Sequence, residues 1–380
     1  MASARRRAVA AAPTVAAALA ALDRLAPFAC AASWDNVGLL AGRPEWPARR
    51  GLLAIDLTDA VAEEALRAAV DLLVVYHPPI FKDLRRVTPD AEAPTRRLPD
   101  LLAARVSIIA LHTALDAAVG GTNDALLDAF DLVARRPLEP LVDETGCKLV
   151  VFVPPDEVDR LRAALSAAGA GVIGHYSECG YELRGRGSFR GDERTNPAVG
   201  RRQRLEFVEE ARLEMVVPRR GLDDVVRALY ANHSYEEPAF DLYPTRRVLG
   251  RGAAGMGRVG QLRRPQTGAA LLQALGQRVD LSIAAVVGSP RRRFRSVVAA
   301  AGAFGVREFG ERDALYLTGE FKHHDALALL KRGVTAVALG HDASERPALE
   351  SVRRRMLAAL PALKLSRARM DRSPLRAVRI

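Results

Sequence analysis

The chain has 380 residues, enough for two domains that each bury a core of their own. Its hydrophobic content of 49% and charged content of 27% exclude a disordered protein. The net charge of +11 does not by itself indicate nucleic-acid binding, because only five of the 56 basic residues are lysines. The arginines are scattered without interleaved aromatic residues, so the composition does not favour nucleic acid as the main partner.

The Ala-rich N-terminus resembles a signal peptide, with basic residues ahead of an apolar run. Asp23 interrupts that run, and its apolar residues recur at helical spacing from Val15 to Leu25, as in an amphipathic helix packed on a core. No window is apolar enough to span a membrane, and the three cysteines form no CxxC pair. We therefore expect a cytoplasmic protein without a disulfide scaffold.

The first segment alternates short apolar runs with a helical pattern, which is typical of α/β packing. Two of its predicted strands end in a histidine, His77 and His112, and Asp116 follows His112 by four residues. The predicted strands cover 51–58, 71–77 and 106–113, and a helix is predicted over 59–70.

The middle of the chain has a different pattern. Residues 148–176 predict a strand, a helix and a turn, and residues 212–244 repeat a strand–helix–strand plan. This length suits a small ferredoxin-like module, and loops rich in Gly, Pro and Arg flank it. We predict two similar α/β core segments, 1–142 and 248–380, that form one metal-binding core interrupted by an α+β insert at 143–247.

The last segment returns to the first plan: an apolar strand, a polar turn with histidine, then a helix. His341 ends its last strand and Glu345 follows four residues later, so both would share one face of a helical turn. Glu320 and His324, also four residues apart, follow another strand. The predicted strands cover 282–288, 296–302, 314–319 and 335–341, and a helix is predicted over 323–333.

Three strands therefore deliver a histidine to their carboxyl ends, where open α/β sheets place their ligand crevice. A lone histidine after a strand is more often a hydrogen-bonded structural residue. Three at equivalent places, each with an acid within reach, favour a site for a divalent metal, although such ligands do not distinguish Zn, Fe, Mn and Ni. The two histidines of the insert, His175 and His233, are interpreted as structural or surface residues.

Weaker signals are each open to a simpler reading. The GxGxxG match at 255–260 follows no clean strand, and Pro265 stands where a dinucleotide-binding helix should begin, so we do not predict such a site. For Asp35 and Asn36 two interpretations are open: one of them lines the ligand crevice, or they cap a turn. For Lys82 the two interpretations are contact with an anionic substrate and, more commonly for such a residue, a solvated lysine in a loop.

Five ordered motifs resemble those of the NIF-three-like family, whose members are labelled GTP cyclohydrolase type 2 homologues. The resemblance covers nearly the whole chain and implies a dinuclear metal centre and a toroidal homo-hexamer. The insert resembles the PII- or CutA-like module that some members carry. The motifs are "WDNVGLLAG" (34–42), "YHPPIF" (76–81), "HTALDAAVGGTND" (112–124), "TGEFKHHDAL" (318–327) and "GHDASER" (340–346).

Carried onto this sequence, the family's metal ligands fall on His77, Asp116, His341 and Glu345. Tyr76 stands where the first histidine of the HHP-type motif is usual, and a phenol is a poorer ligand than imidazole near neutral pH. The resemblance therefore implies one well-occupied metal and a weaker second. Glu345 is the best candidate to bridge two ions, because a carboxylate has two oxygens to share.

Two functions remain open from the sequence. The first is a metal-dependent hydrolase acting on a nucleotide-like or phosphorylated small molecule, in which the metal lowers the pKa of bound water. His112, Glu320 and His324 would then act as general acid or base, or would only orient the ligands. The second is a non-catalytic oligomeric metal-binding, metal-trafficking or regulatory protein whose insert senses an unknown small-molecule ligand.

Overall fold

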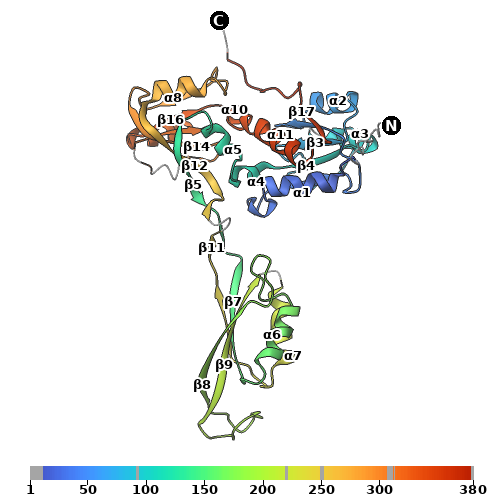
Figure 1. The fold of residues 1–380 in the computed structure, drawn as a ribbon, viewed down its shortest axis with the longest axis vertical. Helices are drawn as coiled ribbons and strands as arrows, with labels where there is room; N and C mark the ends of the chain where they lie inside the picture. Colours follow the sequence, from blue (N-terminus) through green and yellow to red (C-terminus); the bar gives the residue numbers. More distant parts are fainter. Residues whose placement is uncertain are drawn as a thin grey trace, which may run out of the picture. The chain divides into compact units, whose positions relative to one another are not determined.

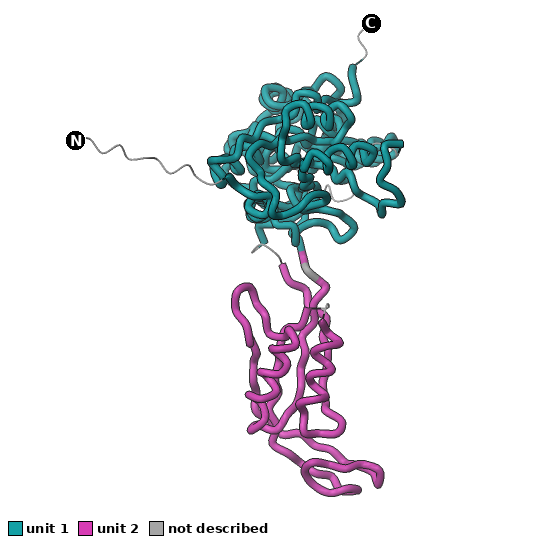
Figure 2. Tube along the Cα trace, turned by 90° about the vertical axis from the view of Figure 1, so that its right-hand side faces the viewer, with its two compact units in different colours: residues 1–141, 249–380 teal, residues 142–248 magenta. Residues whose placement is uncertain are grey.

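The computed structural model describes residues 12–90, 94–218, 221–248, 252–305, 311 and 313–377. Its elements divide the chain into two compact units (Figures 1 and 2). One unit joins residues 1–141 to 249–380, and the other is residues 142–248; the insert was predicted at 143–247. The basic residues at the start of the signal-peptide-like stretch lie outside the described residues.

The first sheet of the larger unit has the strand order β1-β4-β3-β2-β17. Its last four strands are parallel, and β1 pairs antiparallel with β4. The inner strands β2, β3 and β4 are buried on both faces, which explains their apolar sequences, whereas β17 at the edge of the sheet is mostly exposed. The strands are β1 (Gly38–Ala41), β2 (Arg50–Ala54), β3 (Leu72–Val75), β4 (Ser107–Ala110) and β17 (Lys364–Arg367).

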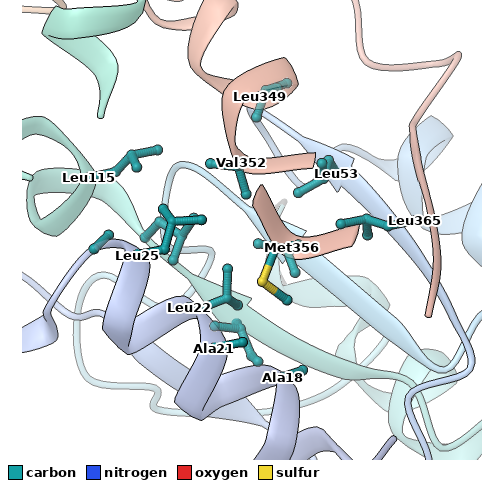
Figure 3. Close-up of a cluster of buried hydrophobic side chains, with 14 of the residues drawn as sticks. Ala18, Ala21, Leu22, Leu25, Leu53, Leu115, Leu349, Val352, Met356 and Leu365 are labelled. Carbon is teal, nitrogen blue, oxygen red and sulfur yellow. The ribbon is translucent and has the colours of Figure 1, made fainter. Parts of the chain in front are cut away.

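Helices cover both faces of this sheet. Side chains alternate between the faces, so Leu53 and Val74 join the core under α1 (Val15–Leu25) and α11 (Pro347–Ala359). Their sequence neighbours Leu52 and Leu73 join the core under α2 (Asp59–Arg67) and α3 (Leu98–Ala103). Figure 3 shows α1 and α11 packing against each other, with Leu22 and Met356 fully buried.

The second sheet of the larger unit has the strand order β13-β16-β15-β14-β12-β5. Its three central strands are parallel and its edges antiparallel. The helices α5 (Thr122–Leu127) and α8 (Gly268–Leu275) pack on one face, and α9 (His323–Lys331) on the other. The strands are β5 (Leu132–Pro140), β12 (Gly255–Thr267), β13 (Ala285–Val287), β14 (Arg293–Ala300), β15 (Ala314–Thr318) and β16 (Thr335–Ala338).

The strands predicted in the two core segments are all present in this unit, as are the three predicted helices, which are α1, α2 and α9. The GxGxxG match lies inside β12, and Pro265 continues that strand rather than opening a helix. The GxGxxG stretch therefore does not form the turn between a strand and a helix that binds a dinucleotide in that motif. None of the described helices combines the length and apolar character needed to cross a membrane.

The smaller unit is an antiparallel sheet with the order β10-β7-β9-β8, packed against α6 (Val158–Ala167) and α7 (Leu222–Asn232). It has a core of its own, as expected for an α+β insert. The long β8–β9 hairpin was not singled out from the sequence. The strands are β7 (Gly146–Val153), β8 (Gly180–Phe189), β9 (Glu206–Pro218) and β10 (Phe240–Pro244), with β6 (Val142–Asp143) and β11 (Arg247–Val248) pairing separately.

Candidate metal centre

Three strand ends from the two sheets of the larger unit meet at one place. His77 follows β3, His112 follows β4, and His341 follows β16. The ring centroids of His77 and His112 lie 5.4 Å apart, and those of His77 and His341 lie 5.5 Å apart. The histidines that the sequence placed at equivalent strand ends are therefore neighbours in space.

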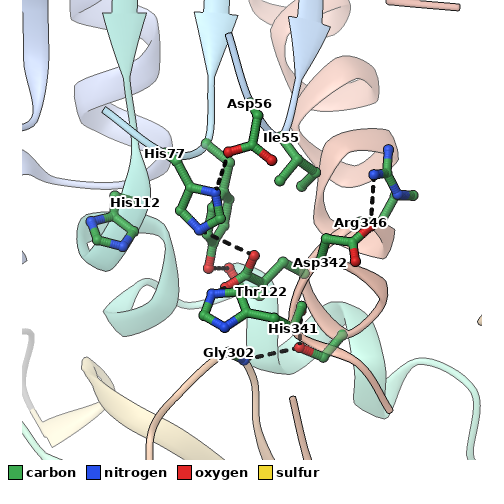
Figure 4. A network of polar contacts seen from close by, with 12 residues as sticks. Ile55, Asp56, His77, His112, Thr122, Gly302, His341, Asp342 and Arg346 are labelled. Carbon is green, nitrogen blue, oxygen red and sulfur yellow. Dashed lines mark hydrogen bonds and ion pairs between the residues drawn. The ribbon is translucent and has the colours of Figure 1, made fainter. Parts of the chain in front are cut away.

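His77, His341 and Glu345 form the closest group of metal-binding atoms among the described residues. One ligand atom from each lies within 4.8 Å of the other two. His77 Nε2 lies 3.3 Å from one oxygen of Glu345, and His341 Nε2 lies 3.2 Å from the other. Figure 4 shows the rings of His77 and His341 close together, with Asp56 beside His77. His341 and Glu345 are the first and last residues of the short helix α10 (His341–Glu345), so their four-residue spacing puts both on one helical turn.

A carboxylate holds the remaining nitrogen of each of these imidazoles. His77 Nδ1 lies 2.9 Å from Asp56 Oδ1, and His341 Nδ1 lies 3.2 Å from Glu320 Oε1. Such partners fix the ring orientation and the tautomer of a metal-binding histidine. Glu320, a candidate general acid or base, thus contacts the Nδ1 of His341, on the opposite side of the ring from Glu345. Asp56 was not singled out from the sequence. It follows β2 by two residues, just as His77 follows β3 by two residues, and this shared position was the available signal.

The space around Glu345 fits a bound cation. Its Oε2 is buried, and His77 Nε2 faces it at 3.3 Å without the geometry of a good hydrogen bond, so a cation there would compensate the carboxylate better. Gly302, with a φ of +64°, leaves the neighbouring space open, because a Cβ there would lie 2.6 Å from Glu345 Oε1 and 3.6 Å from His341 Nε2. Two imidazoles and one carboxylate are a donor set that suits a divalent transition metal.

The charges of these groups are coupled. Burial raises the pKa of Glu345, but the contacts with His341 and His77 outweigh burial and hold that pKa below its usual value. Burial lowers the pKa of His77, yet the carboxylates of Asp56 and Glu345 raise it to about 10. The contact with Glu345 likewise raises the pKa of His341, to about 9. The carboxylates therefore attract positive charge, and protons and a metal ion compete for the same nitrogens.

Asp116 lies outside this three-residue group. It accepts a hydrogen bond from the fully buried hydroxyl of Tyr76, which also lies 3.3 Å from Thr122 Oγ1. Burial raises the pKa of Tyr76 well above its usual value, so the phenol stays neutral and donates. Burial also raises the pKa of Asp116, to about 6. Tyr76 is thus hydrogen-bonded to Asp116, the carboxylate that the family resemblance assigns to the metal. Asp116 stays a predicted ligand.

His112 is held in a strained position. Its φ is +30°, in a region that residues other than glycine rarely adopt. Its Nδ1 lies 2.8 Å from Asp35 Oδ1, and Asp35 also accepts a 3.1 Å hydrogen bond from the Thr113 N–H. Burial raises the pKa of Asp35, but the hydrogen bonds from His112 and Thr113 outweigh burial and lower it. The ionised Asp35 therefore fixes Nδ1 of His112 and leaves Nε2 for other contacts.

The remaining candidate, His324, is exposed on α9, and its ring contacts that of His323 at 5.5 Å. It is not part of the group around Glu345. In the insert, His233 Nε2 lies 2.9 Å from the Phe152 carbonyl and its Nδ1 accepts from the Tyr235 N–H. His233 is therefore structural and His175 lies at the surface, which agrees with their interpretation as structural or surface residues.

Residues 13–374 match the family model described as Duf34/NIF3 (NGG1p interacting factor 3). A Halalkalibacterium halodurans relative is 36% identical over 327 residues, covering 84% of this chain and 86% of the relative. A Bacillus subtilis relative is 33% identical over 337 residues, covering 88% and 89%. Each is named as a GTP cyclohydrolase 1 type 2 homolog.

Solved structures of two similar proteins have the same fold over nearly the whole chain. The Bacillus cereus protein related to NIF3 superposes with a TM-score of 0.63 at 29% identity, covering 96% of this chain and 99% of that one. The Staphylococcus aureus protein SA1388 gives a TM-score of 0.75 at 22% identity, with the same coverage, and so supports the fold alone. The predicted fold class, an α/β core with a small α+β insert, is confirmed.

Proposed function

The chain belongs to the Duf34/NIF3 family, and on that premise we propose that it is a metal-dependent hydrolase of phosphorylated or nucleotide-like small molecules. His77, His341 and Glu345 would hold the first divalent ion. Asp116 would complete the set for a second, weaker ion. The observation that carries the proposal is the buried Glu345 carboxylate, each of whose two oxygens faces one imidazole Nε2, that of His77 or that of His341.

The residues around the centre have separable roles in such a reaction. A divalent ion held there would supply Lewis acidity, which activates water and polarises a phosphoryl or carbonyl oxygen. Asp56 and Glu320 would keep the imidazoles of His77 and His341 oriented. His112, fixed by Asp35, would take a proton from the attacking water and return it to the leaving group.

A second function stays in view because the insert is a separately folded unit on the metal-binding core. In this alternative the protein is a non-catalytic oligomeric metal-binding, metal-trafficking or regulatory protein, and the insert senses a small ligand. The two proposals share the metal centre and differ only in turnover.

The first experiment is the metal content per chain of protein purified without chelator. We expect one to two ions in the wild type and loss of most of them in His341→Ala and Glu345→Ala. Tyr76→His should raise occupancy, because it restores an imidazole at the place of the phenol. A wild type that stays metal-free after incubation with Zn, Mn and Fe would remove the basis of both proposals.

A measurement of catalytic turnover then distinguishes the hydrolase from the non-catalytic metal-binding protein. A hydrolase should cleave at least one member of a panel of nucleotides and phosphoesters, and His112→Gln should lose most of that activity at unchanged metal content. Metal-loaded protein that cleaves none of them would leave the binding function standing.

A further inference from the structure

Two exposed aromatic rings stand beside the candidate metal centre. The side chains of Trp34 and Phe81 are 62% and 49% exposed, and their ring centroids lie 6.0 Å apart. Both rings also contact His112, at 5.9 Å and 6.3 Å. His112 in turn lies 5.4 Å from His77, so a short chain of rings leads from the exposed pair to the metal-binding group.

The polar residues next to Trp34 hold its loop in place. Asp35 accepts hydrogen bonds from His112 and from both the N–H and the hydroxyl of Thr113. Asn36 Nδ2 donates to the Ile80 carbonyl at 2.6 Å, which ties this loop to the loop that carries Phe81. Hydrogen bonds therefore hold the loops that carry the pair, whereas most of the Trp34 side chain is exposed.

A large aromatic side chain on a fixed loop, exposed beside a polar centre, is typical of a ligand-contact surface. Lys82 follows Phe81, is exposed, and forms no ion pair within the described part of the chain. A positive charge next to Phe81 in the sequence favours an anionic rather than a cationic ligand at this surface. Aromatic faces bind planar rings of many kinds, because stacking needs a π-face and no particular hydrogen-bond pattern.

We propose that Trp34 and Phe81 form a stacking subsite for the planar heteroaromatic ring of a substrate whose phosphate is bound at the metal centre. The inference rests on the proposed function for the position of the phosphate, and it narrows the substrate class to nucleotide-like molecules. Trp34 and Phe81 position the ring and take no part in proton transfer.

The chain offers a direct optical test, because it has only two tryptophans, Trp34 and Trp46. In a Trp46→Phe background, Trp34 is the sole indole emitter. Zn-loaded protein is titrated with AMP, GMP and UMP, and with ribose 5-phosphate and inorganic phosphate, which lack a ring. We expect saturable quenching by at least one nucleotide and none by the two ring-free phosphates.

Calorimetry on variants then measures the contribution of the ring. Trp34→Leu should weaken binding of that nucleotide by about tenfold or more, and leave binding of ribose 5-phosphate unchanged. Tyr176→Leu removes an exposed ring of the insert, 76% exposed, and should change neither. Metal content is measured on every variant, so loss of the metal centre is recognised separately.

Three results would overturn the inference. One is equal affinity for nucleotides and ribose 5-phosphate in both wild type and Trp34→Leu, with full metal content; the metal-dependent function would survive it. Another is no binding of any of the three nucleotides at millimolar concentration. The third is Trp34 emission that is blue-shifted and shielded from acrylamide in the ligand-free protein, which would show that a second copy of the chain covers the pair.

Discussion

Glu345 is the residue on which the candidate centre depends most. Both of its oxygens face an imidazole Nε2, and the side chain is almost fully buried. A buried carboxylate is stable only when cations or hydrogen-bond donors compensate its charge. In the metal-free protein the two histidines do so as imidazolium ions, and a bound metal would replace their protons.

Gly302 tests whether the space beside Glu345 is needed. We expect Gly302→Ala to lose most of the bound metal, because its Cβ would lie 2.6 Å from Glu345 Oε1. Gly305→Ala is the matched control: its φ of +85° imposes a similar backbone strain of about 1–2 kcal/mol, but a Cβ there meets no atom of the described residues within 4 Å. Metal analysis of both variants decides the point. Equal metal content would show that the space is not part of the centre.

The raised pKa values of His77 and His341 predict how the metal-free protein responds to pH. A histidine whose pKa rises on folding contributes stability that is complete below its unfolded pKa of about 6.5. That stability is lost as the pH rises through the folded values of about 9 and 10. The melting temperature of chelator-treated protein should therefore fall between pH 7 and pH 9.

Two comparisons check this cause. Glu345→Gln removes the charge that both histidines share and should flatten the dependence. Zn-loaded protein should gain stability over the metal-free form as the pH rises, because the metal needs neutral imidazoles. A metal-free melting temperature that is constant or rises from pH 7 to pH 9 would contradict the assigned charges.

The elements of the core are joined by a buried arginine on β12. Arg258, only 2% exposed, pairs with Asp124 of α5 at 3.1 Å and donates to the carbonyls of Ala117 and Ala118 at the end of α4 (His112–Ala117). It also donates to two carbonyls of its own strand. These contacts fix the helices that follow His112 against the second sheet.

Removing one partner of a buried ion pair leaves the other charge uncompensated. Arg258→Met should therefore lower the free energy of unfolding by about 3–5 kcal/mol. Arg263→Met is the matched control on the same strand: its pair with Asp131 at 3.0 Å is exposed, and the loss should be about 1 kcal/mol or less. Urea unfolding of both variants gives the comparison, and similar losses would show that Arg258 is not a critical link.

At the scale of the whole chain, the two halves of the core exchange strands. β5 comes from the first half and pairs with β12 in the second sheet, whereas β17 comes from the second half and pairs with β2 in the first sheet. The insert leaves the core between these halves. Its ends are close together, because Val142 and Val248 are cross-strand partners.

This arrangement predicts that the insert is dispensable for the metal centre. Replacing residues 143–247 by a short Gly-Ser linker should leave a folded core with the wild-type metal content, since the two units have separate hydrophobic cores. Circular dichroism and metal analysis are the measurements, and residues 142–248 expressed alone should also fold. Loss of metal from a folded, linker-closed core would show that the insert contributes to the centre.

The sequence by itself determined the fold class, and it singled out His77, His341 and Glu345, which the structure brings together. Hydrophobic periodicity is a local property, so the strands ending at His77, His112 and His341 and the helical pairing of His341 with Glu345 could be predicted. The ordered motifs then identified the family. His324 shows the limit of that reasoning, because its spacing matches that of a site residue although it lies exposed on α9.

Only the tertiary structure decided which partners meet. Asp56, Asp35 and Gly302 belong to elements far along the chain from the histidines they contact or face, and sequence spacing cannot show such contacts. Sequence spacing also does not show that the Tyr76 hydroxyl donates a hydrogen bond to Asp116. Nor does hydrophobic periodicity predict that Trp34 is exposed. Long-range packing determines these distances and exposures, and it therefore determines the chemistry that the site can support.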